Sequence, residues 1–127
     1  MAITATVRYS NGGTSSETAF TFSPASDFTA GTFAVLFVAA DNSATNGASN
    51  DITSVTDSLG NTWTKYQSPL YDPGSAYQGI QGGVFTTSMD AGTITTSTTI
   101  SVNFGFIVAA KVVVLNEVAP TTGYRIV

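Results

Sequence analysis

Residues Phe33–Ala39 read F-A-V-L-F-V-A, and this almost unbroken apolar stretch decides the fold class. A run of that length, followed by a polar loop, is typical of a central β-strand that is buried on both faces. Ala109–Val118 is a second long segment rich in β-branched residues, which favour the pleated surface of a sheet. No long stretch repeats apolar residues at the 3.6-residue period of a helix. The sequence therefore predicts an all-β protein.

Shorter strands are expected on both sides of these two segments, separated by turn residues. They are Ala2–Ser10, Thr18–Phe22, Ile52–Thr56, Thr62–Tyr66, Gly79–Thr87, Thr98–Phe104 and Tyr124–Val127. By alternation Ile3, Ala5, Val7 and Tyr9 should share one face of their strand, and Ile100, Val102 and Phe104 should face inward. The pair Gly82-Gly83 suggests a β-bulge. About eight strands in a single domain, residues 1–127, predict a two-sheet antiparallel sandwich that is jelly-roll-like or Ig-like.

Charged side chains make up only 9% of the residues, against about 25% in a typical domain, and the net charge is −4. Hydroxyl side chains take their place, with 21 Thr and 14 Ser. The basic residues Arg8, Lys65, Lys111 and Arg125 are scattered and form no stripe that could neutralise phosphates, which argues against nucleic acid as a partner. No apolar run approaches the roughly 18 residues of a membrane span. So little surface charge repels neighbouring copies weakly, which suits a protein packed against others.

Catalytic residue types are scarce. The chain contains no His and no Cys, so neither a Ser-His-Asp arrangement nor a common zinc site can be built. Glu17, Glu117 and six Asp could in principle supply the carboxylate pair of a glycosidase, and Glu117 is the best of this set. Asp27, Asp72 and Asp90 lie in turn contexts, where Asp is expected for conformation alone. We therefore predict a non-enzymatic protein without catalytic residues or a cofactor.

The sharpest local motif is V-T-D-S-L-G-N-T-W, residues Val55–Trp63. Asp57 can accept hydrogen bonds from backbone N–H groups two or three residues further on, and Gly60 supplies a position with positive φ. Because β-forming residues flank the turn on both sides, the motif predicts a tight hairpin. The alternative interpretation is a loop tip that contacts a ligand.

Trp63 is the only Trp in the chain. A single Trp in a strand usually fills the core, with its indole N–H bonded to the backbone. The alternative is a platform on which a sugar ring stacks. Tyr66, Tyr71 and Tyr77 lie near Trp63 in sequence, so the four rings could form an aromatic patch for a glycan or a protein.

The loop and the chain ends supply the remaining candidates. Asp41–Asp51 has oxygen ligands for calcium but lacks the D-x-D-x-D-G pattern and a late Glu, so we predict a solvated loop and no metal site. Terminal strands must pair or leave bare edges, so Ala2–Ser10 and Tyr124–Val127 either close this domain's own sheets or pair with a neighbouring copy. Tyr124 and Ile126 therefore join the four aromatic residues as a candidate interaction surface.

The order of these segments carries a resemblance. An apolar strand, the V-T-D-S-L-G-N-T-W motif, a strand ending in G-V-F-T-T, the segment A-G-T-I-T-T-S-T-T-I-S-V-N-F and V-V-V-L-N-E-V follow one another between Thr32 and Pro120. This order resembles β-sandwich domains of bacterial surface proteins and tailed-phage virion proteins, in which a V-T-D-S-x-G-N-x-Tyr/Trp hairpin recurs. The resemblance implies a binding or structural module and supplies no catalytic residues. The lone domain and the absence of a secretory signal at the N-terminus fit a virion protein better than a secreted adhesin.

Three functions remain open at the level of sequence. The first is a structural protein of a phage virion, assembled in the host cytoplasm, that decorates or cements the capsid by binding other copies of itself or a major capsid protein. The second is a module that binds carbohydrate or a cell surface, in a tail fibre or an adhesin. The third is an extracellular fibre subunit whose terminal strands insert into the next copy.

Overall fold

The computed structural model describes residues 3–41, 52–67, 70–71, 80–88 and 92–119, and within them it is built of nine strands and no helix. The strands are β1 (Thr4–Gly13), β2 (Glu17–Phe22), β3 (Phe33–Asp41), β4 (Ile52–Asp57), β5 (Trp63–Gln67), β6 (Leu70–Tyr71), β7 (Ile80–Thr87), β8 (Ile100–Val108) and β9 (Lys111–Ala119). The predicted all-β class is confirmed. Only the two-residue β6 was not expected from the sequence.

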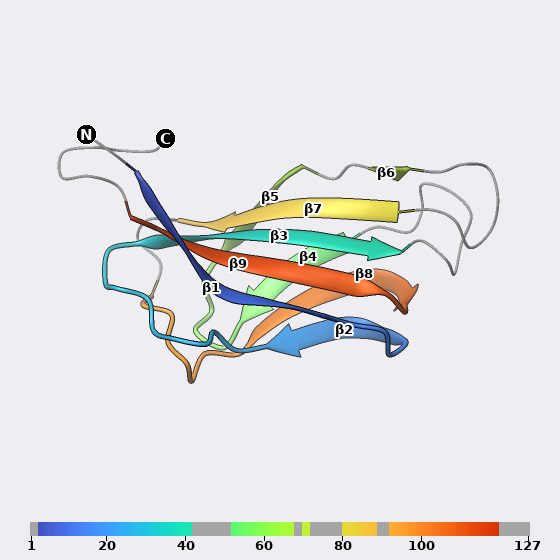
Figure 1. Cartoon of the computed structure of the whole chain (residues 1–127), viewed down its shortest axis with the longest axis horizontal. Helices are drawn as coiled ribbons and strands as arrows, with labels where there is room; N and C mark the ends of the chain where they lie inside the picture. The colour runs from blue at the N-terminus through green and yellow to red at the C-terminus, as the bar shows by residue number, and fades with distance from the viewer. Residues whose placement is uncertain (1–2, 42–51, 68–69, 72–79, 89–91, 120–127) are drawn as a thin grey trace.

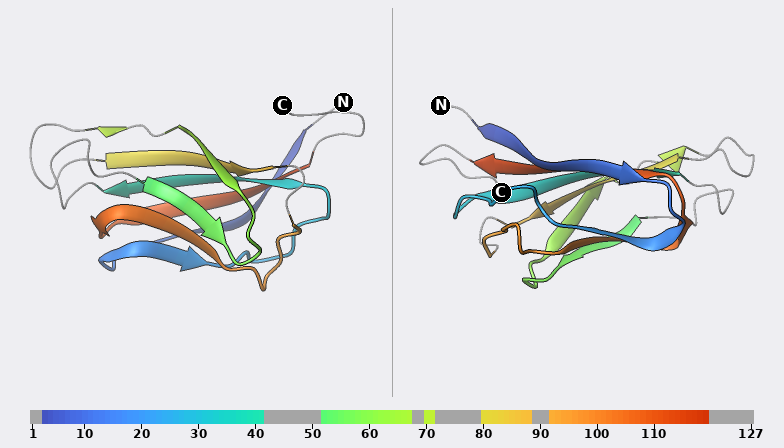
Figure 2. Two further views of the ribbon diagram at one scale, coloured as in Figure 1. Left: turned by 180° about the vertical axis from the view of Figure 1, so that it is seen from behind. Right: turned by 60° about the horizontal axis from the view of Figure 1, so that its bottom comes forward.

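Two antiparallel sheets pack face to face as a sandwich, as Figures 1 and 2 show. The large sheet has the order β1-β9-β3-β7-β5, with β6 also paired to β7, and the small sheet has the order β2-β8-β4. From β1 to β5, each successive strand lies in the other sheet, and so do β7, β8 and β9. Successive strands that alternate between two sheets give a jelly-roll-like arrangement, which is one of the two predicted from the sequence.

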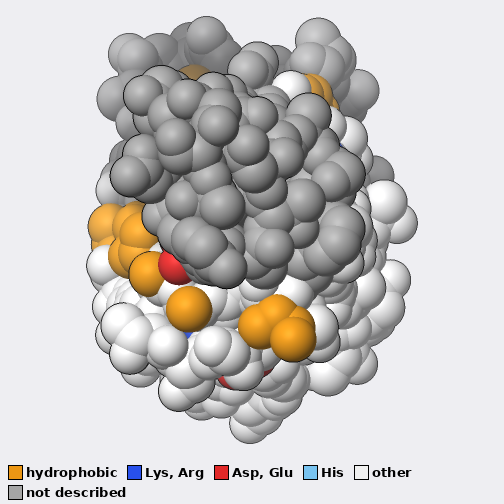
Figure 3. All heavy atoms as spheres, turned by 90° about the vertical axis from the view of Figure 1, so that its right-hand side faces the viewer, with side chains coloured by type: hydrophobic (Ala, Val, Ile, Leu, Met, Phe, Trp, Pro, Cys, Tyr) orange, Lys and Arg blue, Asp and Glu red, His pale blue; other side chains and the backbone are white. Residues whose placement is uncertain are grey.

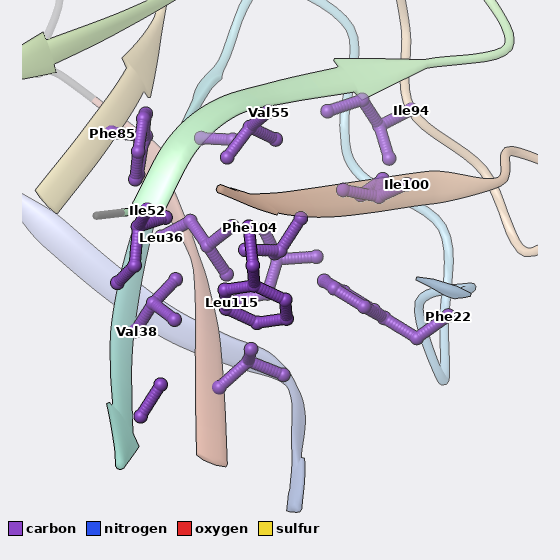
Figure 4. Packing of buried hydrophobic residues seen from close by; sticks show 14 of the residues in the cluster. Phe22, Leu36, Val38, Ile52, Val55, Phe85, Ile94, Ile100, Phe104 and Leu115 are labelled. Atoms are coloured by element: carbon purple, nitrogen blue, oxygen red, sulfur yellow. The ribbon is translucent and has the colours of Figure 1, made fainter. Parts of the chain in front are cut away.

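The core lies between the sheets and is apolar (Figure 4). Its largest fully buried side chains are Phe85, Leu36, Ile52, Ile100, Leu115, Val102, Val108 and Val113, and the polar side chain of Gln81 is fully buried as well. The predicted inward set of β8 is confirmed, because Ile100, Val102 and Phe104 are all buried. Each sheet therefore contributes one apolar face to a shared interior.

The prediction that Ile3, Ala5, Val7 and Tyr9 share one face of the first strand is wrong for Tyr9. The pairing of β1 with β9 shifts register between Val7 and Tyr9, which marks a β-bulge. Tyr9 lies inward and stacks on Phe22, with ring centroids 4.5 Å apart. On the other side of the bulge the alternation is reversed, so Val7 is 57% exposed and Ile3, just before the strand, is 48% exposed.

Register shifts of this kind recur in the pairing of every edge strand. The extra residue lies in the edge strand itself in β1, in β4 between Ile52 and Ser54, and in β5 between Lys65 and Gln67. In the pairing of β2 with β8 the extra residues lie in β8, between Asn103 and Val108. The two pairings of the central strand β3, with β7 and with β9, run without a shift. Bulges bend and twist a strand, so the edges β1, β4 and β5 are irregular whereas the middle of the large sheet is regular.

The bulge expected at the glycine pair of β7 is absent, because Gly82 and Gly83 pair in register with β3. Gly83 faces the core instead. A Cβ added there would come within 2.8 Å of the Phe85 ring and 3.4 Å of Ile52 Cδ1. Glycine at this position therefore makes room for a buried aromatic side chain.

Candidate functional site

The strongest candidate site is the side of the large sheet that faces away from the small sheet, which we call the outer face. Side chains paired across neighbouring strands share a face, so the registers define its members. They are Ala5, Val7, Ser10, Gly12, Phe33, Val35, Phe37, Ala39, Asp41, Thr64, Ile80, Gly82, Val84, Thr86, Val112, Val114, Asn116 and Val118.

Much of this outer face is apolar and open to solvent. Four of its large side chains are about half exposed: Val7 at 57%, Ile80 at 56%, Phe37 at 49% and Val112 at 45%. They come from four adjacent strands and are therefore spread over the face, not confined to one end. At the end of the molecule where β3 ends and β9 begins, Figure 3 shows hydrophobic side chains at the surface beside an acidic one. An exposed apolar area of this kind makes the outer face a candidate interaction surface.

Charge is almost absent from the outer face. Asp41, at the end of β3, is its only charged member among the described residues. The Asp41 carboxylate accepts hydrogen bonds from the backbone N–H groups of Ala110 at 3.1 Å and Ala109 at 3.4 Å, so its charge is held at the β8–β9 turn. A partner would therefore desolvate no unpaired charge in the middle of this surface.

A shallow hollow lies on the outer face beside the most prominent ring. Gly12, Val112, Ala39 and Gly82 form one row across four strands, and all but Val112 are small. The hollow lies at the end of the face where β3 ends and β9 begins, and its lining residues are Gly12, Gly13, Thr14, Ala39, Ala40, Asp41, Ile80, Ala110, Lys111 and Val112. Phe37 stands in the neighbouring row, two residues before Ala39 on the same strand. The outer face therefore has a projecting aromatic ring next to a depression at one end.

The outward surface of the small sheet, on the opposite side of the sandwich, is polar. On the outward side of the small sheet, the Thr21 and Ser101 hydroxyls are hydrogen-bonded at 2.9 Å. The Asn103 side-chain amide donates to Ser54 at 3.1 Å and to Thr56 at 3.5 Å. Polar side chains linked across strands in this way suit contact with water. The two outward surfaces of one domain thus differ, and only the large sheet presents a broad apolar one.

The V-T-D-S-L-G-N-T-W motif forms the predicted tight turn but not a hairpin of paired strands. Asp57 Oδ1 accepts the backbone N–H groups of Leu59 at 2.9 Å and Asn61 at 3.1 Å, and Gly60 has φ of +77°. However, β4 pairs with β8 in the small sheet and β5 with β7 in the large one. The motif is therefore a corner that carries the chain from one sheet to the other.

Trp63 is engaged at this corner. Its ring packs partly buried against the core cluster, as the core interpretation predicted. Its indole N–H donates to Asp57 Oδ2 at 2.8 Å, so the expectation of a backbone acceptor was wrong. Asn61 Nδ2 donates to the same oxygen at 2.9 Å. The ring of Trp63 therefore packs on the core, and its indole N–H binds the carboxylate at the corner.

The other predicted interaction residues are not brought together by the described structure. Tyr66, at the β5 bulge, is 65% exposed. Tyr71 lies in β6, next to β7, and its side chain is outside the described part of the chain. Tyr77, Tyr124 and Ile126 also lie outside the described residues. The aromatic patch and the role of the C-terminal segment therefore stay predictions, whereas the N-terminal strand pairs with β9 of its own chain.

Glu117, the best candidate for a catalytic acid, is a structural anchor. It is buried and forms an ion pair with Arg8, and its Oε2 accepts hydrogen bonds from the Thr29 N–H and, at 3.0 Å, from the Thr32 hydroxyl. Burial alone would raise the pKa of Glu117, but the hydrogen bonds from Thr29, Arg8 and Thr32 and the Arg8 charge together lower it. A general acid needs the opposite shift.

Glu17, the other Glu of the chain, is paired as well. Its Oε1 lies 2.6 Å from Nζ of Lys111, whose side chain is fully buried. The same ammonium group donates to the backbone oxygens of Ser15 and Ala109. The described residues contain no group of three or more potential metal ligands, and most of the Asp41–Asp51 loop lies outside them.

The comparisons with known proteins yield no relative, because no protein-family model, curated protein or solved structure matches the chain. Within the described residues there is also no helix long and apolar enough to cross a membrane.

Sequence reasoning did not single out the outer face, although a signal for it was present. In an antiparallel sheet with one solvated face, apolar and polar residues alternate, and Phe33–Ala39 does not alternate.

Proposed function

We propose that this chain is a non-enzymatic structural protein that docks onto a larger assembly through its outer face. The observation that carries the proposal is the contrast between the two surfaces of the sandwich. The large sheet presents exposed apolar side chains such as Phe37 and Val112, and the small sheet presents a ladder of hydroxyl and amide groups. A domain that rests on a shell needs one surface for the shell and another for water.

The assembly that fits best is a phage virion, in which the chain would decorate or cement the capsid. Support for this step comes from the sequence: the V-T-D-S-L-G-N-T-W motif resembles the hairpin that recurs in β-sandwich domains of bacterial surface proteins and tailed-phage virion proteins, and the chain is rich in hydroxyls and poor in charge. The jelly-roll-like wrap is compatible with the proposal, but it is shared by domains of many functions.

The carbohydrate-binding alternative has weaker support from the geometry. Its central element was Trp63, whose indole N–H is bonded to Asp57 and whose ring packs on the core. Of the proposed aromatic patch, Tyr66 is the ring that the described structure shows to be exposed. A single exposed Tyr at an edge strand is a small platform compared with the outer face.

Co-sedimentation with virions tests the proposal. The chain should be found by mass spectrometry in purified particles, and the isolated wild-type chain should rebind to particles stripped of it. Phe37→Lys puts a charge in the centre of the outer face and should abolish rebinding. Ile107→Lys is the matched control, because Ile107 is 57% exposed on the outward side of the small sheet. Absence of the chain from particles, or equal rebinding by both variants, would contradict the proposal.

A further inference from the structure

We propose that the occupant of the outer face is a second copy of this chain, stacked face to face about a two-fold axis. Phe37 of each copy would then occupy the hollow beside Ala39 of the other. This inference rests on the proposed function, since it takes the outer face as the docking surface, and it names a second copy of the chain as the part of the assembly that this face contacts. Four observations support it: the strand pattern, the area, the charge and the shape of the face.

The strand pattern indicates that both faces of the large sheet are covered in the working state. In antiparallel sheets with one solvated face, strands alternate between apolar and polar residues. The central strand β3 is apolar on both faces up to Ala40, and β9 carries Val112 and Val114 outward as well as Val113 and Leu115 inward. Within one copy the inward set is buried, and at one end of the outward set Phe33 and Val118 are buried too, whereas Phe37 and Val112 are about half exposed. The exposed part of the outward set has the apolar composition of a core without a covering layer.

The area of the outer face is enough for a specific dimer. Five strands spaced about 4.8 Å apart and about eight residues long, at roughly 3.4 Å per residue, give a footprint of about 600 Å² per copy. Two stacked copies would remove about 1,200 Å² from solvent, which is at the lower end of the range for specific interfaces. Sheets stacked in this way pack about 10 Å apart, which is the spacing inside an ordinary sandwich.

The charge distribution of the outer face is compatible with an identical partner. Asp41 is the only charged member among the described residues, and it lies at one end of the face, bonded to backbone N–H groups. A face that carried several like charges would repel a copy of itself, since each charge would meet another of the same sign. An apolar and nearly uncharged face is matched best by another of the same kind, and the chain itself supplies one.

The shape of the face is self-complementary. In a two-fold dimer, if residue i of one copy contacts residue j of the other, then j also contacts i. The two-fold axis would lie in the plane of the interface, perpendicular to the strands, and run between the Phe37 row and the Ala39 row. Rotation about this axis places the Phe37 ring of each copy over the row of small residues in the other copy. Position 12 of this row has no room for a side chain, because an added Cβ would come within 2.4 Å of the Lys111 backbone oxygen. With Gly12 there, nothing projects from the row at this position.

A pair of complementary variants tests the contact between Phe37 and Ala39. Sedimentation velocity should show dimers of the wild-type chain below about 1 mM. Phe37→Glu and Ala39→Lys should each raise the dimer dissociation constant by about 30-fold or more, as expected when a central aromatic contact is lost. An equimolar mixture of the two variants should recover dimers, because the new carboxylate of one copy faces the new ammonium group of the other. Ile107→Lys, on the opposite surface, should dimerise as the wild type does.

Several outcomes would overturn the inference: a wild-type chain that stays monomeric up to about 1 mM, single variants that dimerise normally, or a mixture that stays monomeric. Thermal melting of each variant checks that it is folded, and Phe37→Ser replaces Phe37→Glu if the latter is not. A monomeric wild type whose binding to virions is still abolished by Phe37→Lys would refute the second copy as partner but leave the proposed function standing. A wild-type chain that dimerises but is absent from virions and does not rebind to them would do the reverse.

Discussion

Asp57 at the corner between β4 and β5 offers the sharpest test of how this fold is held together. Its carboxylate accepts four hydrogen bonds: from the backbone N–H of Leu59, from the backbone N–H and the side-chain amide of Asn61, and from the Trp63 indole. The last three donors are partly buried. The Asp57→Ala substitution leaves these three without an acceptor at a site that water reaches poorly.

The expected cost follows from these contacts. At about 1 kcal/mol of net stability for each partly buried hydrogen bond, Asp57→Ala should destabilise the fold by about 3 kcal/mol. For a domain of this size the melting temperature should fall by roughly 10 °C. Asp57→Asn keeps one oxygen for the two backbone N–H groups but turns an amide group toward the other two donors, so it should cost about half as much.

Urea unfolding followed by circular dichroism measures this cost. Fluorescence of Trp63, the only Trp, should report the loss of its local contact separately. Asp27→Ala is the matched control, since Asp27 accepts one exposed hydrogen bond, from the Thr96 N–H at 2.8 Å, and its loss should cost less than about 1 kcal/mol. If Asp57→Ala costs no more than Asp27→Ala, the corner is not held by this carboxylate and the loop-tip interpretation of the motif regains weight.

Two further substitutions test the ion pair and the core. Because the folded-state pKa of Glu117 is lowered, its ionised form contributes stability above an unfolded pKa of about 4.3 that is lost as the pH falls through the folded pKa. The wild type should therefore lose stability in acid relative to Glu117→Gln, and parallel pH profiles in urea unfolding would contradict this. Gly83→Ala should cost about 1–3 kcal/mol, because the added Cβ meets the buried Phe85 ring at 2.8 Å. Gly92→Ala, whose nearest contact would be an ordinary 3.5 Å to Asn61, should be nearly neutral, and equal melting temperatures of the two variants would refute the steric argument.

Local features of the fold could be predicted from the sequence, because they depend on residues close to one another in the chain. The turn chemistry of Asp57 and Gly60 was correct, as was the inward set of β8 that begins with Ile100. The assignment of β4 and β5 to different sheets could not be predicted. Their partners are β8 and β7, and nothing in Val55–Trp63 specifies which distant strand each half will meet.

The errors at β1 and at Trp63 have similar causes. A bulge after Val7 reverses the alternation of β1, and the side chain of Arg8, at the bulge, reaches Glu117 on β9. The Trp63 indole was assigned a backbone acceptor, although the Asp57 carboxylate, six residues away, lies within reach once the chain turns the corner. Both depend on a side chain placed by tertiary structure, which strand periodicity does not describe.

The same structure bears on whether the chain associates through its edges or through a face. Sequence reasoning pointed to the edges, because terminal strands with free hydrogen-bonding groups invite pairing. Yet the edge strands β1, β4 and β5 each carry a bulge, and in β1 the backbone oxygen of Arg8 accepts a hydrogen bond from the backbone N–H of Ala25 at 2.7 Å. Irregular edges are poor templates for an added strand, whereas the regular middle of the large sheet presents Phe37 and Val112 to solvent. The described edges are therefore poorly suited to pairing with an added strand, whereas the central strands are apolar on both faces. This combination favours docking through the outer face over growth by strand insertion.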